Sequence, residues 1–207
     1  MASIKVGLID HGIGNIRSVY NALVKVGTNV TLVQDWAQAE GQQVLILPGV
    51  GNFGGVVDAL IEQGLFEPLR EYLNANKPFI GICVGMQLLF QGSTEAPDRP
   101  GFRLLKGNLL HLSELDSTRI VPSIGWKNLY RPGAEQKHSS PSVAYFVHSF
   151  FVSDYEPVDL VSVYDWHGHG IPAHFAKGKV HGVQFHPEKS RADGVQFLAD
   201  LIEKLTE

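Results

Sequence analysis

The chain has 207 residues, of which 44% are hydrophobic and 18% are charged, and its formal net charge is −4 at pH 7. This composition is typical of a globular protein, and the length suits one large core, so we expect a single domain over residues 1–207. Lysines and arginines form no basic stripe, which argues against a nucleic acid partner. No apolar run approaches the ~18 to 20 residues that span a membrane.

The chain contains a single cysteine, Cys83. A lone cysteine excludes an internal disulfide bond, and a free thiol suits a reducing compartment. The first ten residues lead almost directly into a short apolar strand and lack the charged segment, long apolar core and cleavage site of a secretion signal. We therefore expect a cytoplasmic location.

Strand and helix patterns alternate through the first half of the chain. Short apolar runs predict strands, and apolar residues that recur every three or four positions predict helices. In chain order these are a strand at Ile4–Ile9, a helix at Asn15–Val26, strands at Val30–Val33 and Val44–Leu47, helices at Val56–Gln63 and Leu65–Leu73, a strand at Phe79–Ile82 and a helix at Val84–Phe90. Continuous apolar strands separated by helices indicate a parallel sheet covered on both faces.

The second half of the chain is β-rich and ends in a helix. Turn residues separate strand-like stretches at Arg119–Ile124, Val143–Val152, Leu160–Tyr164 and Lys179–Phe185, and a final helix is predicted at Ala192–Lys204. No linker or internal repeat is visible. The predicted fold is α/β with three layers: an open mixed or parallel sheet with flanking helices and a β-rich second half.

Cys83 lies at the junction of a predicted strand and a predicted helix, within the sequence Gly81-Ile-Cys83-Val-Gly85. Glycines two positions before and after the cysteine remove side chains that would obstruct a sharp turn, as in the nucleophile elbow of serine hydrolases. The start of the helix adds backbone N–H groups and a positive dipole end, which favour a thiolate. Because a lone cysteine is more often a buried structural residue, the assignment needs a partner base.

The partner base is found near the end of the chain, in the sequence GVQFHPEKS. A second apolar strand leads to His186 and, two positions later, to Glu188. On an extended segment these positions face the same way, so the carboxylate can orient the imidazole, and Pro187 helps to hold the segment extended. A Cys, a His and an acid in this arrangement meet the requirements of an activated thiol nucleophile. We predict Cys83, His186 and Glu188 as a catalytic triad.

The turn at residues 48–51, Pro-Gly-Val-Gly, directly follows the predicted strand Val44–Leu47. Loops at the carboxyl edge of a parallel sheet line its functional crevice, so this turn and the cysteine elbow open on the same edge. One interpretation is an oxyanion hole, in which an N–H near Gly49 or Val50 acts with that of Val84. The other is a structural glycine turn, and the pattern leaves both open.

Two further features have weaker signals. Gln87 lies one helical turn after Cys83 on the same helix face, where it either lines a substrate pocket or has no role. The Gly-Ile-Gly-Asn run at residues 12–15 resembles half of a dinucleotide fingerprint, but it lacks the third glycine and the acidic residue after a second strand. We therefore expect no nucleotide at this turn.

Four histidines cluster in the second half of the chain, namely His167, His169, His174 and His181. A histidine pair two residues apart on a strand can bind zinc, but Gly168 and Gly170 indicate a turn here. No cysteine and no nearby acid completes a ligand set. We expect solvated or locally hydrogen-bonded histidines, no metal ion and no cofactor.

Together the three motifs resemble the class I, or triad, glutamine amidotransferases, whose hallmarks are GxCxG, PGxG and HPE. Further segments, DHGIGNIRSV, PGVGNF, GICVGMQLLF, IGWKNL, YFVHSF and GVQFHPEKS, are similar over nearly the whole chain to the glutaminase subunits of imidazole glycerol phosphate synthases. The chain departs from that pattern at Val84, where leucine is usual, and at His11, where an aromatic residue is more frequent. Neither change removes a functional group, because Val84 would act through its backbone N–H.

The resemblance implies a reaction and a partner. Cys83 would attack the carboxamide of L-glutamine, His186 would take the thiol proton and pass it to the departing ammonia, and Glu188 would orient His186. Water would then cleave the glutamyl thioester to glutamate. The ammonia would enter a cyclase subunit with a (β/α)₈ barrel, which forms a heterodimer with the glutaminase and makes imidazole glycerol phosphate and an aminoimidazole carboxamide ribonucleotide in histidine biosynthesis.

The resemblance also assigns further site residues. It places substrate contacts at Gly49, Gln87, His148 and Ser149, and oxyanion donors at Val50 and Val84. The segments that it places around the ammonia exit carry Asn15, Trp126, Tyr145 and Lys189, which are either ordinary surface residues or the rim of the partner interface.

Three other functions compete with this interpretation. The nearest is a glutaminase subunit of another amidotransferase, serving anthranilate, aminodeoxychorismate or pyridoxal phosphate synthesis, against which the IGWKNL and YFVHSF segments argue. The second is a cysteine hydrolase that acts alone with the same elbow. The third is a catalytically idle binding subunit, which the intact Cys83, His186 and Glu188 disfavour.

Overall fold

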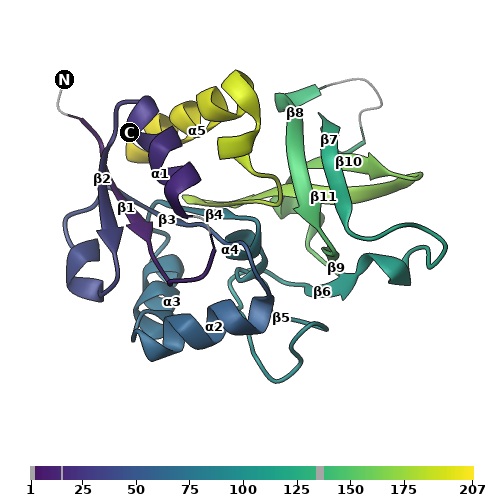
Figure 1. Cartoon of the computed structure of the whole chain (residues 1–207), viewed down its shortest axis with the longest axis horizontal. Coiled ribbons are helices and arrows are strands. Elements are labelled where there is room, and N and C mark those ends of the chain that lie inside the picture. The colour runs from purple at the N-terminus through teal and green to yellow at the C-terminus, as the bar shows by residue number, and fades with distance from the viewer. Residues whose placement is uncertain (1–2, 15, 134–137) are drawn as a thin grey trace.

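The computed structural model describes residues 3–14, 16–133 and 138–207, and its central feature is a large mixed sheet (Figure 1). Within these residues, nine strands are ordered β2-β1-β3-β4-β12-β11-β10-β7-β8. They are β1 (Lys5–Ile9), β2 (Asn29–Val33), β3 (Val44–Leu47), β4 (Phe79–Ile82), β7 (Ser123–Tyr130), β8 (His138–His148), β10 (Leu160–Trp166), β11 (His169–Lys177) and β12 (Val180–Val183). A second, three-stranded sheet contains β5 (Gly92–Ser93), β6 (Asn108–His111) and β9 (Phe150–Ser153).

The first five strands of this order, β2 to β12, pair in parallel and form the α/β half of the molecule. Helices cover both faces of this half. Figure 1 shows α1 (Ile16–Lys25) and α5 (Arg191–Thr206) together on one face, with α2 (Phe53–Glu62) and α3 (Phe66–Asn74) on the other. The residues of β3 and β4 are fully buried between them, which explains their continuous apolar sequences. The predicted three-layer α/β fold is confirmed.

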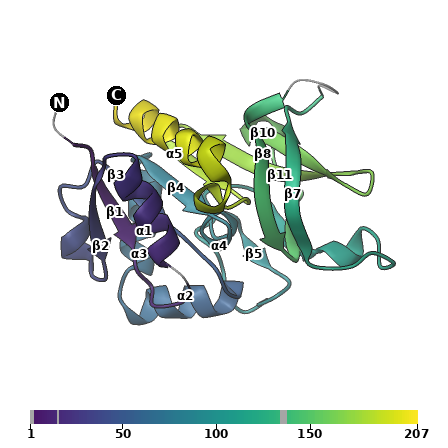
Figure 2. The same cartoon turned by 45° about the horizontal axis from the view of Figure 1, so that its top comes forward.

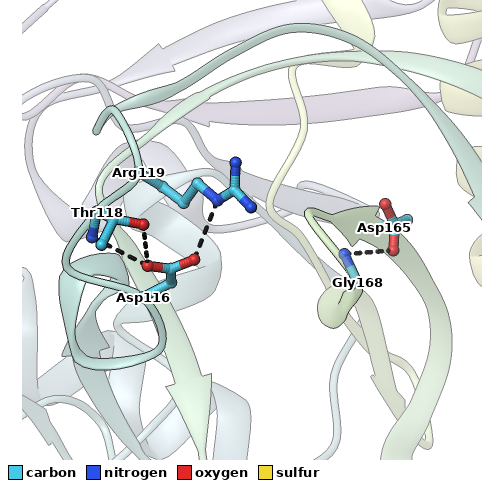
Figure 3. A network of polar contacts seen from close by, with 5 residues as sticks. All are labelled: Asp116, Thr118, Arg119, Asp165 and Gly168. Carbon is cyan, nitrogen blue, oxygen red and sulfur yellow. Dashed lines mark hydrogen bonds and ion pairs between the residues drawn. The ribbon is translucent and has the colours of Figure 1, made fainter.

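The remaining strands, β11, β10, β7 and β8, pair in antiparallel fashion and project beyond the helices (Figure 2). The β10–β11 hairpin turns at His167 and Gly168, which both have positive φ, and the Gly168 N–H donates to the Asp165 carboxylate at 3.0 Å (Figure 3). Glycine adopts this conformation without a steric cost, so the predicted turn between the histidines is present.

One predicted strand is wrong, because Arg119–Ile124 is mostly a turn and the strand β7 begins at Ser123. Asp116 organises this turn: its carboxylate accepts hydrogen bonds from the N–H and hydroxyl of Thr118 at 2.9 and 2.6 Å and from Arg119 Nε at 3.0 Å (Figure 3). These hydrogen bonds lower the pKa of Asp116 to about 2. Pro122, which has no N–H to give to a ladder, follows the turn.

The predicted helix Val84–Phe90 is shorter than expected, since α4 spans Val84–Gln87. The chain then turns to reach the small sheet, where the Gln91 N–H donates to the Gly107 carbonyl at 3.0 Å. The parallel pairing of β4 with β12 places Ile82 beside Val183. Consequently the residues that follow both strands emerge at the same edge of the sheet.

Candidate active site

Cys83 occupies a strained elbow between β4 and α4. Its φ and ψ are 54° and −109°, a conformation that a non-glycine residue adopts only when its surroundings impose it. A side chain at Gly81 would collide with the Gly85 backbone, and one at Gly85 would collide with the Leu47 carbonyl. Both glycines are therefore required for the elbow, as the sequence predicted, and the Cys83 N–H is anchored to the Val183 carbonyl at 2.7 Å.

His186 and Glu188 follow β12 and form a buried pair. His186 Nδ1 lies 2.8 Å from Glu188 Oε1, and the two side chains are 2% and 3% exposed. The backbone of His186 is fixed from two sides, because its N–H donates to the Tyr145 carbonyl and its carbonyl accepts from Ser190 Oγ. Since Nδ1 faces the carboxylate, Nε2 is the ring nitrogen available to Cys83.

The electrostatics of the pair favour a protonated imidazole. Burial alone would lower the pKa of His186, but the neighbouring Cys83 and Glu188 outweigh it and raise the pKa to about 10. The proximity of the Cys83 sulfur is the largest cause that raises this pKa, although the hydrogen bond from Nε2 is not aligned in this conformation. The arrangement can hold a thiolate beside an imidazolium, which is the activated form of a cysteine nucleophile.

The turn at residues 48–51 packs directly on the elbow. A side chain at Gly49 would meet Val84 Cβ at 2.6 Å, and the Val84 N–H donates to the Gly49 carbonyl at 3.5 Å. In a trans peptide the carbonyl and the following N–H point in opposite directions, so the Val50 N–H points away from that of Val84. The two predicted oxyanion donors therefore do not converge in this conformation.

The first loop of the chain clamps the same turn. His11 is 4% exposed, and its Nε2 lies 3.0 Å from the Pro48 carbonyl, to which it donates. Burial lowers the pKa of His11, so the ring is neutral and its Nδ1 carries no proton. Gly14 approaches Val50 so closely that a side chain there would collide with it. Within the run that resembles half of a nucleotide fingerprint, Ile13 and Gly14 thus pack against Gly51 and Val50.

A cavity of about 260 Å³ opens in front of Cys83 and contains most of the predicted substrate contacts. Gln87, His148 and Ser149 line it, while Gly49 lies behind it, on a smaller cavity next to His11. Glu95 also lines the larger cavity and was not predicted; its Oε2 accepts the Phe53 N–H at 2.7 Å. No sequence pattern marks Glu95, because the loop that carries it has no regular period.

The His148 ring is fully engaged within the protein. Its Nδ1 donates to the Phe150 carbonyl at 2.8 Å, and its Nε2 accepts from the Tyr164 hydroxyl at 2.7 Å, which also lies 3.1 Å from Ser123 Oγ. Burial lowers the pKa of His148 to about 4, so the ring is neutral. At His148, therefore, only the backbone or the edge of the ring is available to contact a substrate.

The sequence analysis also missed Gln184, whose Nε2 lies 3.5 Å from Cys83 Sγ. The available signal was the spacing of Gln184 and His186, which stand two positions apart and so lie on one side of an extended segment. The predicted extended conformation does not continue to Glu188, because Pro187–Lys189 is a short 3₁₀ helix, although Glu188 still reaches His186. Gln184 Oε1 in turn accepts a hydrogen bond from Gln87 Nε2 at 3.0 Å.

Three of the four predicted interface residues lie close together. Trp126 and Tyr145 are cross-strand partners on β7 and β8 with ring centroids 5.7 Å apart, and Lys189 is exposed on the short 3₁₀ helix Pro187–Lys189 that contacts β8. The Arg191 guanidinium lies 4.5 Å from the Trp126 ring centroid, and it was not predicted. Asn15 lies outside the described residues.

The histidine cluster does not form a metal centre in the described part of the chain, where no group of three potential ligands is found. His174 and His181 are buried, and their facing ring nitrogens are 2.9 Å apart. Burial lowers the pKa of His174 to about 3 and that of His181 to about 4. His174 and His181 are therefore locally hydrogen-bonded, which is one of the two arrangements that the sequence predicted for these histidines.

Comparison with known proteins identifies the family. The model of the family "Glutamine amidotransferase class-I" matches residues 7–204. The chain belongs to the class I glutamine amidotransferases. The matched region contains all three motifs on which the resemblance was based, and the fold agrees: a solved glutamine amidotransferase superposes with a TM-score of 0.74 and 20% identity, covering 96% of this chain and 98% of its own.

Among class I glutamine amidotransferases, several similar curated relatives carry one name. "Imidazole glycerol phosphate synthase subunit HisH" of Caldanaerobacter subterraneus is 36% identical, covering 84% of this chain and 86% of the relative. The same subunit of Desulfitobacterium hafniense is 38% identical, covering 81% and 78%. "Imidazole glycerol phosphate synthase hisHF" of Schizosaccharomyces pombe is 39% identical over 72% of this chain, which spans 28% of that longer protein.

Proposed function

We infer that the chain is the glutaminase subunit of an imidazole glycerol phosphate synthase: it hydrolyses L-glutamine and supplies the ammonia to a cyclase. The single observation that carries this inference is the buried His186–Glu188 pair beside Cys83 in a chain similar to HisH proteins over most of its length. In the fungal relative the name hisHF and the greater length suit a fusion of two such activities. We propose that this chain works with a (β/α)₈ cyclase subunit as a heterodimer.

The proposed reaction begins with attack of the Cys83 thiolate on the carboxamide carbon of glutamine. His186, protonated because its pKa is raised to about 10, gives its proton to the departing nitrogen as the C–N bond breaks, which releases ammonia. The product is a glutamyl thioester. His186 then accepts a proton from an attacking water, the C–S bond breaks, and glutamate leaves. Glu188 holds the ring so that Nε2 faces the reacting atoms throughout.

Glu95 supports the choice of an amino acid substrate. It provides a carboxylate on the wall of the Cys83 cavity, opposite in charge to the α-ammonium group of glutamine. We propose that Glu95 binds this group, while Gln87 and the backbone at residues 148–149 line the rest of the cavity. An esterase acting on a neutral ester has no need of such a charge.

The conformation of residues 48–51 supports a proposal for how the partner would control hydrolysis. With the Gly49 carbonyl on the Val84 N–H, the negatively charged intermediate has one donor blocked and the other turned away. We propose that binding of the liganded cyclase reverses the Gly49–Val50 peptide, so that the N–H groups of Val50 and Val84 together receive the oxyanion. Glutamine is then hydrolysed only when the ammonia can be used.

The ammonia must leave toward the partner without reaching bulk water. We propose that the cyclase covers the surface formed by Trp126, Tyr145, Lys189 and Arg191, which is connected to the site because Tyr145 holds both His186 and Ser190. Among the described residues, no helix is long and apolar enough to cross a membrane. The free thiol suits work in the reducing cytoplasm.

The test measures glutamate production from glutamine by this chain, alone and with an imidazole glycerol phosphate synthase cyclase loaded with its nucleotide ligand. The proposal predicts strong stimulation by the liganded cyclase and formation of imidazole glycerol phosphate. Equal glutamate production with and without the cyclase would favour a hydrolase acting alone. Stimulation by an anthranilate or aminodeoxychorismate synthase subunit instead would favour another amidotransferase.

A further inference from the structure

Gln184 is in direct contact with the sulfur of the proposed nucleophile. Its Nε2 donates an N–H to Cys83 Sγ over 3.5 Å, and only 1% of the residue is exposed. Its position is fixed by the backbone, because it directly follows β12 and its own N–H donates to the Ala173 carbonyl at 2.8 Å. The contact is therefore built by the pairing of the strands and not by a mobile surface side chain.

A second glutamine bonds to the other end of the Gln184 amide. Gln87 Nε2 lies 3.0 Å from Gln184 Oε1, and it is 4% exposed. In this arrangement the carbonyl of Gln184 accepts from Gln87, and the NH₂ of Gln184 faces Cys83. A donor at that position stabilises a thiolate, whereas a carbonyl would stabilise the protonated thiol.

We propose that the Gln184 amide stabilises the Cys83 thiolate, and that Gln87 holds this amide in the donating orientation. The catalytic consequence rests on the proposed glutaminase function, whereas the effect on the thiol does not. A hydrogen bond to a charged sulfur in a buried site is stronger than one between neutral groups.

Gln184 would complement His186, whose charge changes during the reaction. His186 loses its proton to the departing ammonia and is neutral when the thioester forms. When water attacks and the C–S bond breaks, sulfur leaves with the bonding electron pair as a thiolate. An amide N–H does not titrate, so Gln184 stabilises this leaving group whatever the protonation state of His186.

The test uses the reactivity of the thiol with iodoacetamide as a function of pH. Cys83 is the only cysteine, so alkylation of the whole chain reports on this sulfur alone, and neither glutamine nor cyclase is needed. Gln184→Met keeps the length of the side chain but has no donor. We expect the midpoint of its pH profile to rise by about one pH unit, which is a roughly tenfold slower reaction at a fixed pH below the midpoint.

Two further variants and one control complete the experiment. Gln184→Glu places a negative charge beside the sulfur and is expected to raise the midpoint further, and Gln87→Leu is expected to raise it less. Gln196→Met, which changes an exposed glutamine of α5 bonded to Asp200, should leave the midpoint unchanged. In the cyclase complex, Gln184→Met should lower kcat for glutamine about tenfold with little change in KM.

A Gln184→Met protein that folds and is alkylated with the parental midpoint would overturn the proposal. Folding is checked by thermal unfolding of each variant. If Gln184→Met does not fold, the alkylation profiles of Gln184→Glu and Gln87→Leu test the proposal. Unchanged midpoints in both variants would contradict a hydrogen bond from Gln184 to the thiolate. If the variants raise the midpoint but the parental chain with liganded cyclase does not hydrolyse glutamine, the role of Gln184 at the thiolate stands and the proposed function is refuted.

Discussion

The backbone N–H of Val84, one of the two predicted oxyanion donors, donates to the carbonyl of Gly49 at 3.5 Å. Because the peptide between Gly49 and Val50 is held this way, the thiol, the imidazole and the carboxylate are assembled while the donors are not. The proposed nucleophile and its base are therefore in place, but the donors that would stabilise the oxyanion are not. A change in the orientation of the Gly49–Val50 peptide is the simplest way to activate such a site.

The first prediction concerns the rate of the isolated chain. One oxyanion donor contributes ~10² to 10³ in rate. Without the cyclase, glutamine hydrolysis should therefore be slower by at least that factor than in the complex with liganded cyclase. The comparison requires steady-state glutamate production at saturating glutamine, and a free chain as fast as the liganded complex would contradict the gating mechanism.

The second prediction concerns Glu188. Glu188→Gln keeps a hydrogen-bonding oxygen near His186 Nδ1 but removes the negative charge that helps to raise the pKa of His186. The imidazolium becomes less stable, and the amide can turn its NH₂ toward the ring and impose the wrong tautomer. We expect glutamine-dependent turnover to fall ~10² to 10⁴-fold, by analogy with the loss of the buried acid in other triads. Activity within threefold of the parent would show that Glu188 has no such role.

The third prediction concerns Lys189, which is exposed next to the triad acid. Lys189→Ala should reduce the stimulation by the cyclase and weaken its binding by ~2 kcal/mol, because an acidic partner group would be left unpaired. Lys179→Ala makes the same charge change at the opposite end of β12 and serves as the control. Titration of each variant with the cyclase at physiological salt measures its affinity and its stimulation. Equal affinity of the two variants would rule out a partner contact at Lys189.

The fourth prediction is a loss of stability in mild acid. Burial lowers the pKa values of His148 and His181 to about 4 and that of His174 to about 3, against 6.5 in the unfolded chain. Between these values the unfolded chain binds more protons, so the free energy of unfolding should fall as pH drops below about 6.5. The slope is ~1.4 kcal/mol per pH unit for each proton.

The raised pKa of His186 acts in the opposite direction near pH 6.5, where the unfolded group is only half protonated, and it adds no slope below about pH 5.5, where the group is protonated in both states. Urea unfolding at pH 7, 6, 5 and 4.5 measures the slope. His174→Gln should make it shallower, whereas His167→Asn, a change at an exposed turn, should not. A flat profile between pH 6.5 and 4.5 would show that the buried histidines titrate normally.

The sequence could predict the parts of the site that depend on local geometry. The elbow at Cys83 follows from glycine spacing at a strand end. The His186–Glu188 pair was predicted from residues two positions apart, although the backbone between them is a 3₁₀ helix and not an extended segment. The contact between Gln184 and Cys83 joins residues 101 positions apart and depends on the pairing of β4 with β12, which no local pattern specifies. The orientation of the Gly49 peptide has no side-chain signature at all.

The errors in the predicted elements have local causes. The apolar and β-branched residues of Arg119–Ile124 suggested a strand, but the hydrogen bonds of Asp116 with Thr118 and Arg119 favour a turn. Side chains of this kind compete with strand ladders by bonding to nearby backbone groups. The apolar residues after Gln87 suggested a longer helix. Leu89 and Phe90 are buried in the core, but their N–H groups bond to carbonyls three residues back, as in a turn, and not four residues back.

The most direct test of the account compares two nitrogen sources in the complex of the Cys83→Ser chain with the cyclase. The account predicts that synthesis of imidazole glycerol phosphate from glutamine falls by at least ~10³-fold, because covalent catalysis is lost. Synthesis from added ammonium salt should continue at the parental rate, because the cyclase is intact. Glutamine-dependent synthesis that survives in Cys83→Ser would contradict the assignment of Cys83 as the nucleophile.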